Sequence, residues 1–70
     1  MMRAVTVKTE TIPLQALLKW CGAAETGGEA KIFIQEGRVT VNGEVCLMRG
    51  KKLHEGDIVG FEGQEFRIVR

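Results

Sequence analysis

Five basic residues in the middle of the chain are the strongest candidates for a functional site. They are Lys31, Arg38, Arg49, Lys51 and Lys52. Positions 31–52 carry these five positive charges against two negative ones, whereas the whole chain has a formal net charge of only +1. Cations gathered in this way attract phosphate groups and release their counterions. The segment therefore predicts a surface for a polyanion on a nearly neutral molecule.

The basic residues at 49, 51 and 52 lie too close together for the ion-pair spacing of a helix. They predict a loop that clamps phosphate groups, or merely a solvated segment that keeps a small protein in solution. Lys31 and Gln35 lie four residues apart, so they would share one face of a helix, and Arg38 continues that face just beyond. This face would contact the same ligand as the loop, with an ordinary exposed helix face as the alternative.

Residue types that carry catalysis or bind metals are few and scattered. Cys21 and Cys46 are the only cysteines and His54 is the only histidine, and their spacing matches neither a metal site nor a nucleophile with its base. We therefore expect two reduced thiols, with Cys21 buried, and neither a cofactor nor a metal nor catalysis. A domain this small also offers little room for a pocket of ~300 Å³ or more.

The length suffices for one domain, which we expect to span residues 1–70 as a monomer. No apolar run approaches the roughly 20 residues of a membrane span. The first residues also lack the apolar stretch of a secretory signal. Both observations predict a cytoplasmic protein without membrane contact.

Two short helices are predicted ahead of the basic loop. Thr11 would cap the first, with Pro13 in its first turn, and Gly22 would end it. Trp20 lies beside the buried stripe of this helix, where covering the small core is its ordinary role. The stripe itself has the i, i+3, i+4, i+7 spacing of a helix and consists of Leu14, Leu17, Leu18 and Cys21.

The second helix begins at a capping box, Thr26-Gly27-Gly28-Glu29, and ends at Gly37. The tight connection between the helices makes a helix-turn-helix-like corner. The amides of the glycine pair could bind an anion at this helix start, although Glu29 favours a purely structural role for them. The apolar stripe of this helix consists of Ala30, Phe33 and Ile34.

The remaining segments have the alternation of strands. Residues 4–8 predict one strand, and residues 38–47 predict a hairpin whose Asn42-Gly43 pair suits a type I′ turn. Residues 58–61 and 65–69 predict two more strands joined by a turn. The sequence thus predicts an α+β fold, with the two-helix corner packed on a small, mainly antiparallel β-sheet. In the hairpin, the residues expected to share the buried face are Val39, Val41, Val45 and Leu47.

Three short sequence strings follow one another along the chain in an order that is typical of one protein family. They are Glu29-Ala30-Lys31, Gly37-Arg38-Val39-Thr40-Val41-Asn42-Gly43 and Leu53-His54-Glu55-Gly56-Asp57-Ile58-Val59, preceded by Leu14, Leu17, Leu18 and Gly22. In this order, residues 14–59 resemble the RNA-binding domain named after small-subunit ribosomal protein four, also called the alpha-L motif. The stand-alone, single-domain members with Thr-Gly-Gly-Glu-Ala-Lys and Arg-Gly-Lys-Lys-Leu are the most similar, since both strings occur here.

The resemblance implies that the protein binds structured RNA, either ribosomal RNA, transfer RNA or other ribosome-associated RNA, and is not an enzyme. It implies an RNA surface on the two-helix corner and the adjoining loop, with contacts from Lys31, Arg49, Lys51 and Lys52. The contact expected of Arg38 comes instead from its place just beyond the polar face of the second helix. Pro13-Leu14-Gln15 and Thr26-Gly27-Gly28 depart from the family, since many members carry a basic residue in each of these places. Stacking of a base on Trp20 and an RNA contact of Lys19 stay open. The alternative function is a small protein–protein adaptor or assembly factor without RNA contact.

Overall fold

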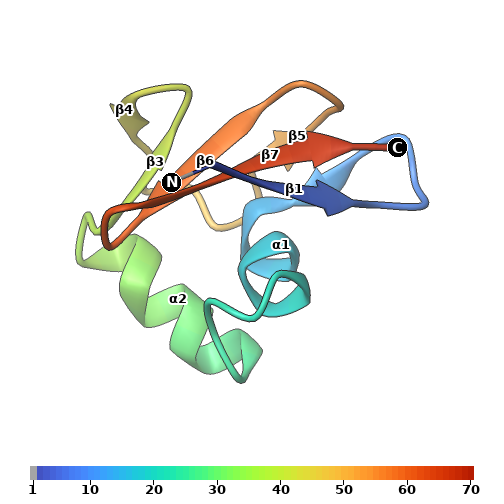
Figure 1. Cartoon of the computed structure of the whole chain (residues 1–70). Helices are drawn as coiled ribbons and strands as arrows, with labels where there is room; N and C mark the ends of the chain where they lie inside the picture. The colour runs from blue at the N-terminus through green and yellow to red at the C-terminus, as the bar shows by residue number, and fades with distance from the viewer. Residues whose placement is uncertain (1) are drawn as a thin grey trace.

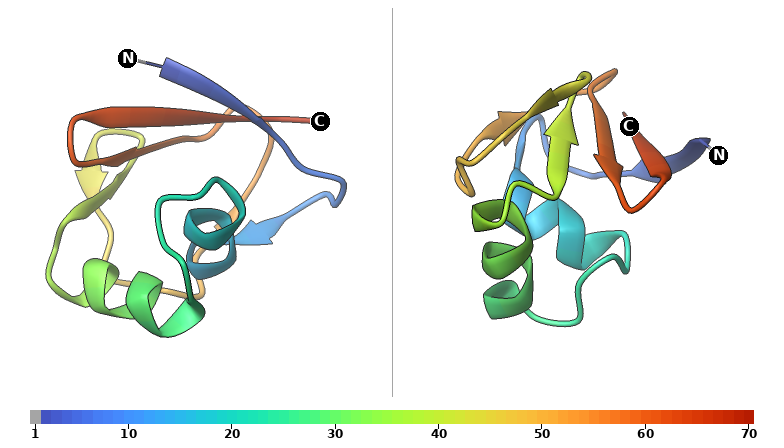
Figure 2. Two further views of the ribbon diagram at one scale, coloured as in Figure 1. Left: turned by 60° about the horizontal axis from the view of Figure 1, so that its bottom comes forward. Right: turned by 90° about the vertical axis from the view of Figure 1, so that its left-hand side faces the viewer.

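The computed structural model describes residues 2–70, in which two helices lie on one side of a five-stranded sheet (Figure 1). The helices are α1 (Leu14–Trp20) and α2 (Gly27–Gln35). Both views of Figure 2 place them on the same side of the sheet. This arrangement is the α+β architecture that the sequence predicts.

The main sheet has the strand order β1-β7-β6-β3-β4. Its strands are β1 (Met2–Thr6), β3 (Val39–Val41), β4 (Glu44–Val45), β6 (Ile58–Phe61) and β7 (Gln64–Val69). Only β1 and β7 run parallel, so the sheet is mainly antiparallel, as predicted. Two short strands that the sequence did not predict, β2 (Ile12–Pro13) and β5 (Lys52–Leu53), pair with each other apart from this sheet.

The core lies between the inner face of the sheet and the buried stripes of the helices. Its fully buried side chains include Leu14, Leu17, Leu18, Ala30, Ile34, Val39, Leu53, Val59 and Ile68. Removing such apolar surface from water stabilises the fold by roughly 25 cal/mol per Å². Within residues 2–70 no polar or charged side chain is buried, so the charged side chains lie at the surface.

The start of α1 differs from the prediction. Thr11 does not cap the helix: Pro13 is the N-cap residue, with an extended backbone, and no side chain caps this end. The first amides of α1 donate instead to carbonyl oxygens of the predicted basic loop. The β2–β5 pair brings this distant segment alongside the helix start, and its backbone satisfies the free amides that were assigned to a local hydroxyl.

The start of α2 matches the predicted capping box. Glu29 N donates to Thr26 Oγ1 at 3.1 Å, and the Glu29 carboxylate accepts from Glu25 N at 3.0 Å. Its end matches as well, because Gly37 has a φ of 74°, a left-handed conformation that glycine adopts without strain. The helix that carries Lys31 is therefore anchored at both ends.

Two tight turns connect the antiparallel strands. Asn42 and Gly43, between β3 and β4, have φ values of 53° and 88°. Glu62 and Gly63, between β6 and β7, have φ values of 50° and 78°. Two successive positive φ angles are what a type I′ turn requires, so the turn predicted at 42–43 is confirmed.

The buried face predicted for the 38–47 hairpin is wrong for two of its four residues. Val39 and Val41 are buried, but Val45 and Leu47 are 60% and 62% exposed. The register pairs Thr40 with Val45, and residues paired across antiparallel strands lie on the same face. A two-residue turn thus places Val45 on the outer face, while Leu47 lies beyond the end of β4.

Cys21 and Cys46 are both free thiols, as expected. Cys21 is buried, and this burial raises the pKa of its thiol above the ordinary value. Neither helix within residues 2–70 has the length and apolar character that crossing a membrane would require.

Candidate nucleic-acid interface

The loop that carries three of the predicted basic residues is held against the start of α1. Leu14 N donates to Lys51 O at 2.8 Å, and Gln15 N donates to Arg49 O at 3.0 Å. Lys52 belongs to β5 and is tied to the same region by the pairing of β5 with β2. The backbone of residues 49–52 is therefore fixed, whereas its three basic side chains are exposed.

Gln15 also joins the starts of the two helices. Its Nε2 donates to Gly27 O at 2.9 Å. A Cβ at position 27 would lie only 3.0 Å from Gln15 Nε2, so glycine suits this close approach. Lys31 follows Gly27 by four residues and lies on the same side of α2, the side nearest the start of α1.

These contacts place Arg49, Lys51 and Lys52 beside the start of α1, and Lys31 lies one turn of α2 beyond Gly27. We call these four residues the basic patch. Within residues 2–70 none of the four forms an ion pair. Their positive charges are therefore available to an external anion. Gln15 was not among the predicted site residues, because its role depends on a contact with a helix twelve positions away.

Arg38 is the fifth predicted residue, and the structure does not bring it together with the patch. It lies before β3, at the opposite end of that strand from the hairpin turn. Its guanidinium pairs with Glu36 at 3.3 Å and with Glu62, and it lies 4.7 Å and 5.4 Å from the ring centres of Phe33 and Phe61. Two carboxylates already engage its charge, and an RNA contact of Arg38 stays a prediction.

A hydrogen-bonded turn lies beside the basic patch. Asp57 Oδ2 accepts from His54 N at 2.8 Å, and Asp57 Oδ1 accepts from Asn42 Nδ2 at 3.2 Å. Partial burial alone would raise the pKa of Asp57, but these hydrogen bonds, with the charges of His54 and Lys51, lower it below the ordinary value of 3.8. Asp57 therefore stays ionised at neutral pH and fixes the turn between β5 and β6.

The amides at the start of α2 lie close to a negative side chain. Thr26 and Glu29 cap this end of the helix as described, which leaves the Glu29 carboxylate where a phosphate would have to bind. The close contact of Gly27 with Gln15 gives the glycine pair a structural role. Phosphate binding at these amides stays a prediction.

Trp20 covers little of the core, because 59% of its surface is exposed. Its Nε1 donates to Thr6 O at 2.8 Å, which orients the ring against the chain that follows β1. The indole borders a shallow apolar hollow of about 180 Å³ that Val7 and Ile12 also line. Stacking of a base on Trp20 stays a prediction, as does an RNA contact of Lys19.

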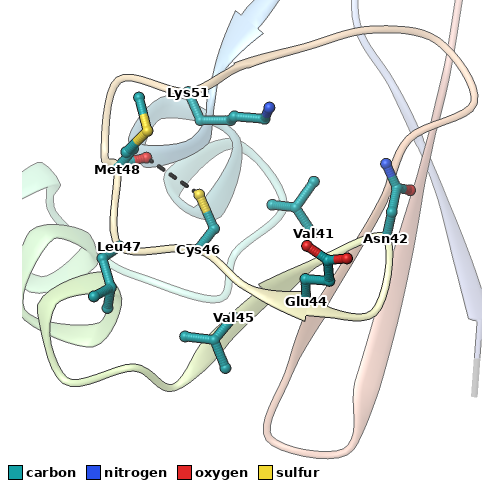
Figure 3. Close-up of a pocket in the computed structure, with 8 residues that line it drawn as sticks. All are labelled: Val41, Asn42, Glu44, Val45, Cys46, Leu47, Met48 and Lys51. Carbon is teal, nitrogen blue, oxygen red and sulfur yellow. Dashed lines mark hydrogen bonds between the residues drawn. The ribbon is translucent and has the colours of Figure 1, made fainter.

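A larger hollow opens next to the basic patch, between the β3–β4 hairpin and the loop that follows it (Figure 3). Its volume is about 390 Å³, so the expectation that so small a domain has little room for such a pocket was wrong. Three of its lining residues carry polar groups: Asn42, Glu44 and Lys51. The sequence identified Asn42 only as a turn former and gave no role to Glu44.

Comparison with known proteins identifies the relatives of this chain. The S4 domain family model matches residues 5–69, which extends beyond positions 14–59 and includes β7. A Bacillus subtilis (strain 168) protein with the name "Probable ribosome maturation protein RlbA" is 41% identical over 70 residues, covering 99% of each chain. YbcJ from Escherichia coli (strain K12) is 40% identical over 58 residues, covering 83% of each chain.

Two solved structures have the same fold. The solution structure of YbcJ, described as revealing an alfaL motif involved in RNA-binding, has a TM-score of 0.75 and 35% identity, and the match covers 100% of this chain and 90% of that one. The 30S ribosomal protein S4e of Thermoplasma acidophilum has a TM-score of 0.74 at 19% identity, and the match covers 89% of this chain and 33% of that one. The predicted two-helix corner on a small sheet is thereby confirmed.

Proposed function

This chain belongs to the S4 domain family, and we propose that it binds structured RNA of the ribosome, or RNA associated with ribosome maturation, through the basic patch. RNA binding by a protein that is not an enzyme follows from membership of the family. The ribosomal assignment is supported by the Bacillus subtilis relative, whose name refers to ribosome maturation. The assignment of the surface is supported by the geometry of the patch.

One observation supports the proposed surface most directly. The four cations of the basic patch form no ion pair within residues 2–70, and the backbone of the loop that carries three of them is fixed by hydrogen bonds. Arg49 and Lys51 are held through their own carbonyl oxygens, so RNA binding need not order the backbone that carries them. Preorganisation of this kind lowers the entropic cost of association. Arg38, the remaining cation of the segment, has its charge paired within the chain.

Each cation of the patch would neutralise a backbone phosphate and release counterions from the RNA. Such contacts read the shape of the phosphate backbone, since phosphates carry no sequence information. A folded RNA presents phosphates from more than one strand at close range, which suits cations that come from both a helix and a loop.

The test is the double variant Lys51→Glu/Lys52→Glu, titrated with a fragment of ribosomal RNA at several salt concentrations. We expect weaker binding to all RNA sequences and a salt dependence that is shallower by about one for each lost phosphate contact. Arg67→Glu/Arg70→Glu is the matched control, because it makes the same change of charge at two exposed positions, one within β7 and one just after it. Equal losses in both double variants, or no loss in the first, would refute the proposed surface.

The class of RNA is tested separately, by crosslinking in cells followed by sequencing of the attached RNA. Enrichment of ribosomal RNA or its precursors is expected. Enrichment of messenger RNA alone would refute the ribosomal assignment while leaving RNA binding in place.

A further inference from the structure

The hollow beside the basic patch combines a polar side with an apolar side. Figure 3 shows Lys51 extending along it with its ammonium group on the side of Asn42, and the Glu44 carboxylate on that same side next to Val41. Cys46 and Met48 lie on the other side, where the Cys46 thiol donates to Met48 O at 3.7 Å. The hollow is therefore an amphipathic slot rather than an apolar groove.

The two charged groups of the slot have no partner within residues 2–70. Neither Lys51 nor Glu44 forms an ion pair or a side-chain hydrogen bond there. Asn42 is fixed by contrast: its Nδ2 donates to Asp57, and its Oδ1 accepts from Ile58 N at 3.0 Å. The slot thus contains one unpaired cation and one unpaired anion. Next to them lies Asn42, whose fixed side chain forms the rigid end wall of the slot.

The rim of the slot is apolar and exposed. Val45, Leu47 and Met48 are 60%, 62% and 66% exposed, so three large apolar side chains face water within four positions of the chain. Neighbouring apolar side chains of this kind mark binding surfaces. A planar ligand that reaches Glu44 and Lys51 would lie against Cys46 and Met48, whereas Val45 is on the outer face of the hairpin, opposite to Glu44.

We propose that this slot receives one unpaired guanine base of the bound RNA. Among the four RNA bases, guanine alone places two adjacent N–H donors beside a carbonyl oxygen on its Watson–Crick edge. A carboxylate such as Glu44 accepts from both donors, and an ammonium such as Lys51 donates one of its three N–H groups to the oxygen, which leaves the others for a neighbouring phosphate. Proteins read bases that are unpaired and extruded from RNA by these edges. The ring of an extruded base stacks between aromatic or other apolar side chains.

The other components of RNA match the slot less well. A phosphate would meet the Glu44 carboxylate, which repels it. Adenine, cytosine and uracil each present to a carboxylate at least one acceptor where guanine presents a donor. The inference rests on the proposed function, because the base enters the slot only when the RNA lies on the basic patch.

Cys46 reports directly on occupancy of the slot. It is half-buried and lines the slot, whereas Cys21 is buried and its pKa is raised by that burial, so alkylation of the native protein distinguishes the two thiols.

The probes are RNA hairpins that are identical except for one bulged nucleotide: guanine, inosine, adenine or none. We expect the guanine hairpin to abolish alkylation of Cys46 by iodoacetamide at saturation, and the hairpin without a bulge to leave it unchanged. Cys46→Ser identifies the adduct by its absence.

Glu44→Gln tests the recognition itself. Inosine lacks the exocyclic amino group, so the wild-type protein should prefer guanine over inosine by about tenfold, and the variant should lose this preference. The ratio of the affinities for the guanine and inosine hairpins is the informative quantity, because removing a negative charge beside the patch strengthens binding of every RNA. Protection of Cys46 by every bound hairpin alike, or by none of them, would overturn the guanine slot and leave the proposed function intact. Failure of all hairpins and of ribosomal RNA to bind would refute the proposed function itself.

Discussion

Asn42 has a backbone role and a side-chain role, and the sequence pattern predicts only the first. Its positive φ of 53° forms the hairpin turn, which the Asn-Gly pair predicts. Its side chain also joins that turn to the start of β6, by donating to Asp57 and accepting from Ile58 N. The hairpin and the β5–β6 turn are thereby held together at the end wall of the slot.

Replacing the Asp57 carboxylate by an amide should destabilise the fold. Asp57→Asn retains one acceptor oxygen where two are used, by His54 N and by Asn42, so we expect a loss of about 1–2 kcal/mol at pH 7. The folded-state pKa of Asp57 is lowered, so its contribution is complete above the ordinary value of 3.8 and is lost as pH falls through the folded-state pKa. Urea unfolding of both proteins from pH 7 down to pH 2 measures this.

The control is Glu55→Gln, which changes an exposed carboxylate two positions away and should leave the unfolding midpoint unchanged. The stability difference between the wild type and Asp57→Asn should narrow as pH falls. A difference that persisted at the lowest pH would show that the loss comes from packing and not from the ionised carboxylate.

At the scale of elements, the patch depends on a hydrogen bond between the two helices. Gln15→Ala removes the donor to Gly27 O, which should lower stability by about 1 kcal/mol and weaken RNA binding several-fold. The salt dependence should stay the same, because no phosphate contact is lost. Gln64→Ala is the matched control, since Gln64 is exposed on β7 and has no side-chain hydrogen bond within residues 2–70. Thermal unfolding and RNA titration of both variants test this, and a shallower salt dependence in Gln15→Ala would contradict it.

The elements themselves were predictable where the signal is local. The capping box at Thr26, the apolar stripe of α1 and the Asn42-Gly43 turn all depend on residues within a few positions of each other. The outward side of Val45 was predictable too, because a two-residue turn already implies its pairing with Thr40. The error lay in grouping residues by hydrophobicity without counting across the turn.

What depends on distant segments was not predictable from local patterns. The carbonyl oxygens that cap α1 come from residues 49 and 51, and no propensity of Thr11 or Pro13 reveals them. The same holds for the site. The grouping of residues 49–52 was visible as charge, but the free state of Lys51 and the engagement of Arg38 depend on which carboxylates the fold places nearby.

For the whole molecule, a formal net charge of +1 conceals an uneven distribution. The strands β6 and β7 with their turn carry Glu62 and Glu65, and Glu62 neutralises Arg38 on that side. The four cations of the basic patch lie on α2 and in the loop beside the start of α1, and positions 31–52 as a whole carry five positive charges against two negative ones. Long-range attraction of RNA should therefore act on one side of the protein and orient it before contact.

The salt dependence of RNA binding therefore measures how many of these cations contact phosphate groups. Four phosphate contacts predict a fall in affinity of roughly 100-fold between 50 mM and 200 mM salt. Arg38→Gln should leave that dependence unchanged and lower stability by no more than about 1 kcal/mol, because an exposed ion pair is worth little. If Arg38 instead released Glu36 and Glu62 to bind a phosphate, the variant would reduce the slope by about one. Titration of wild type and variant with the same RNA across this salt range decides whether the RNA surface comprises four cations or all five.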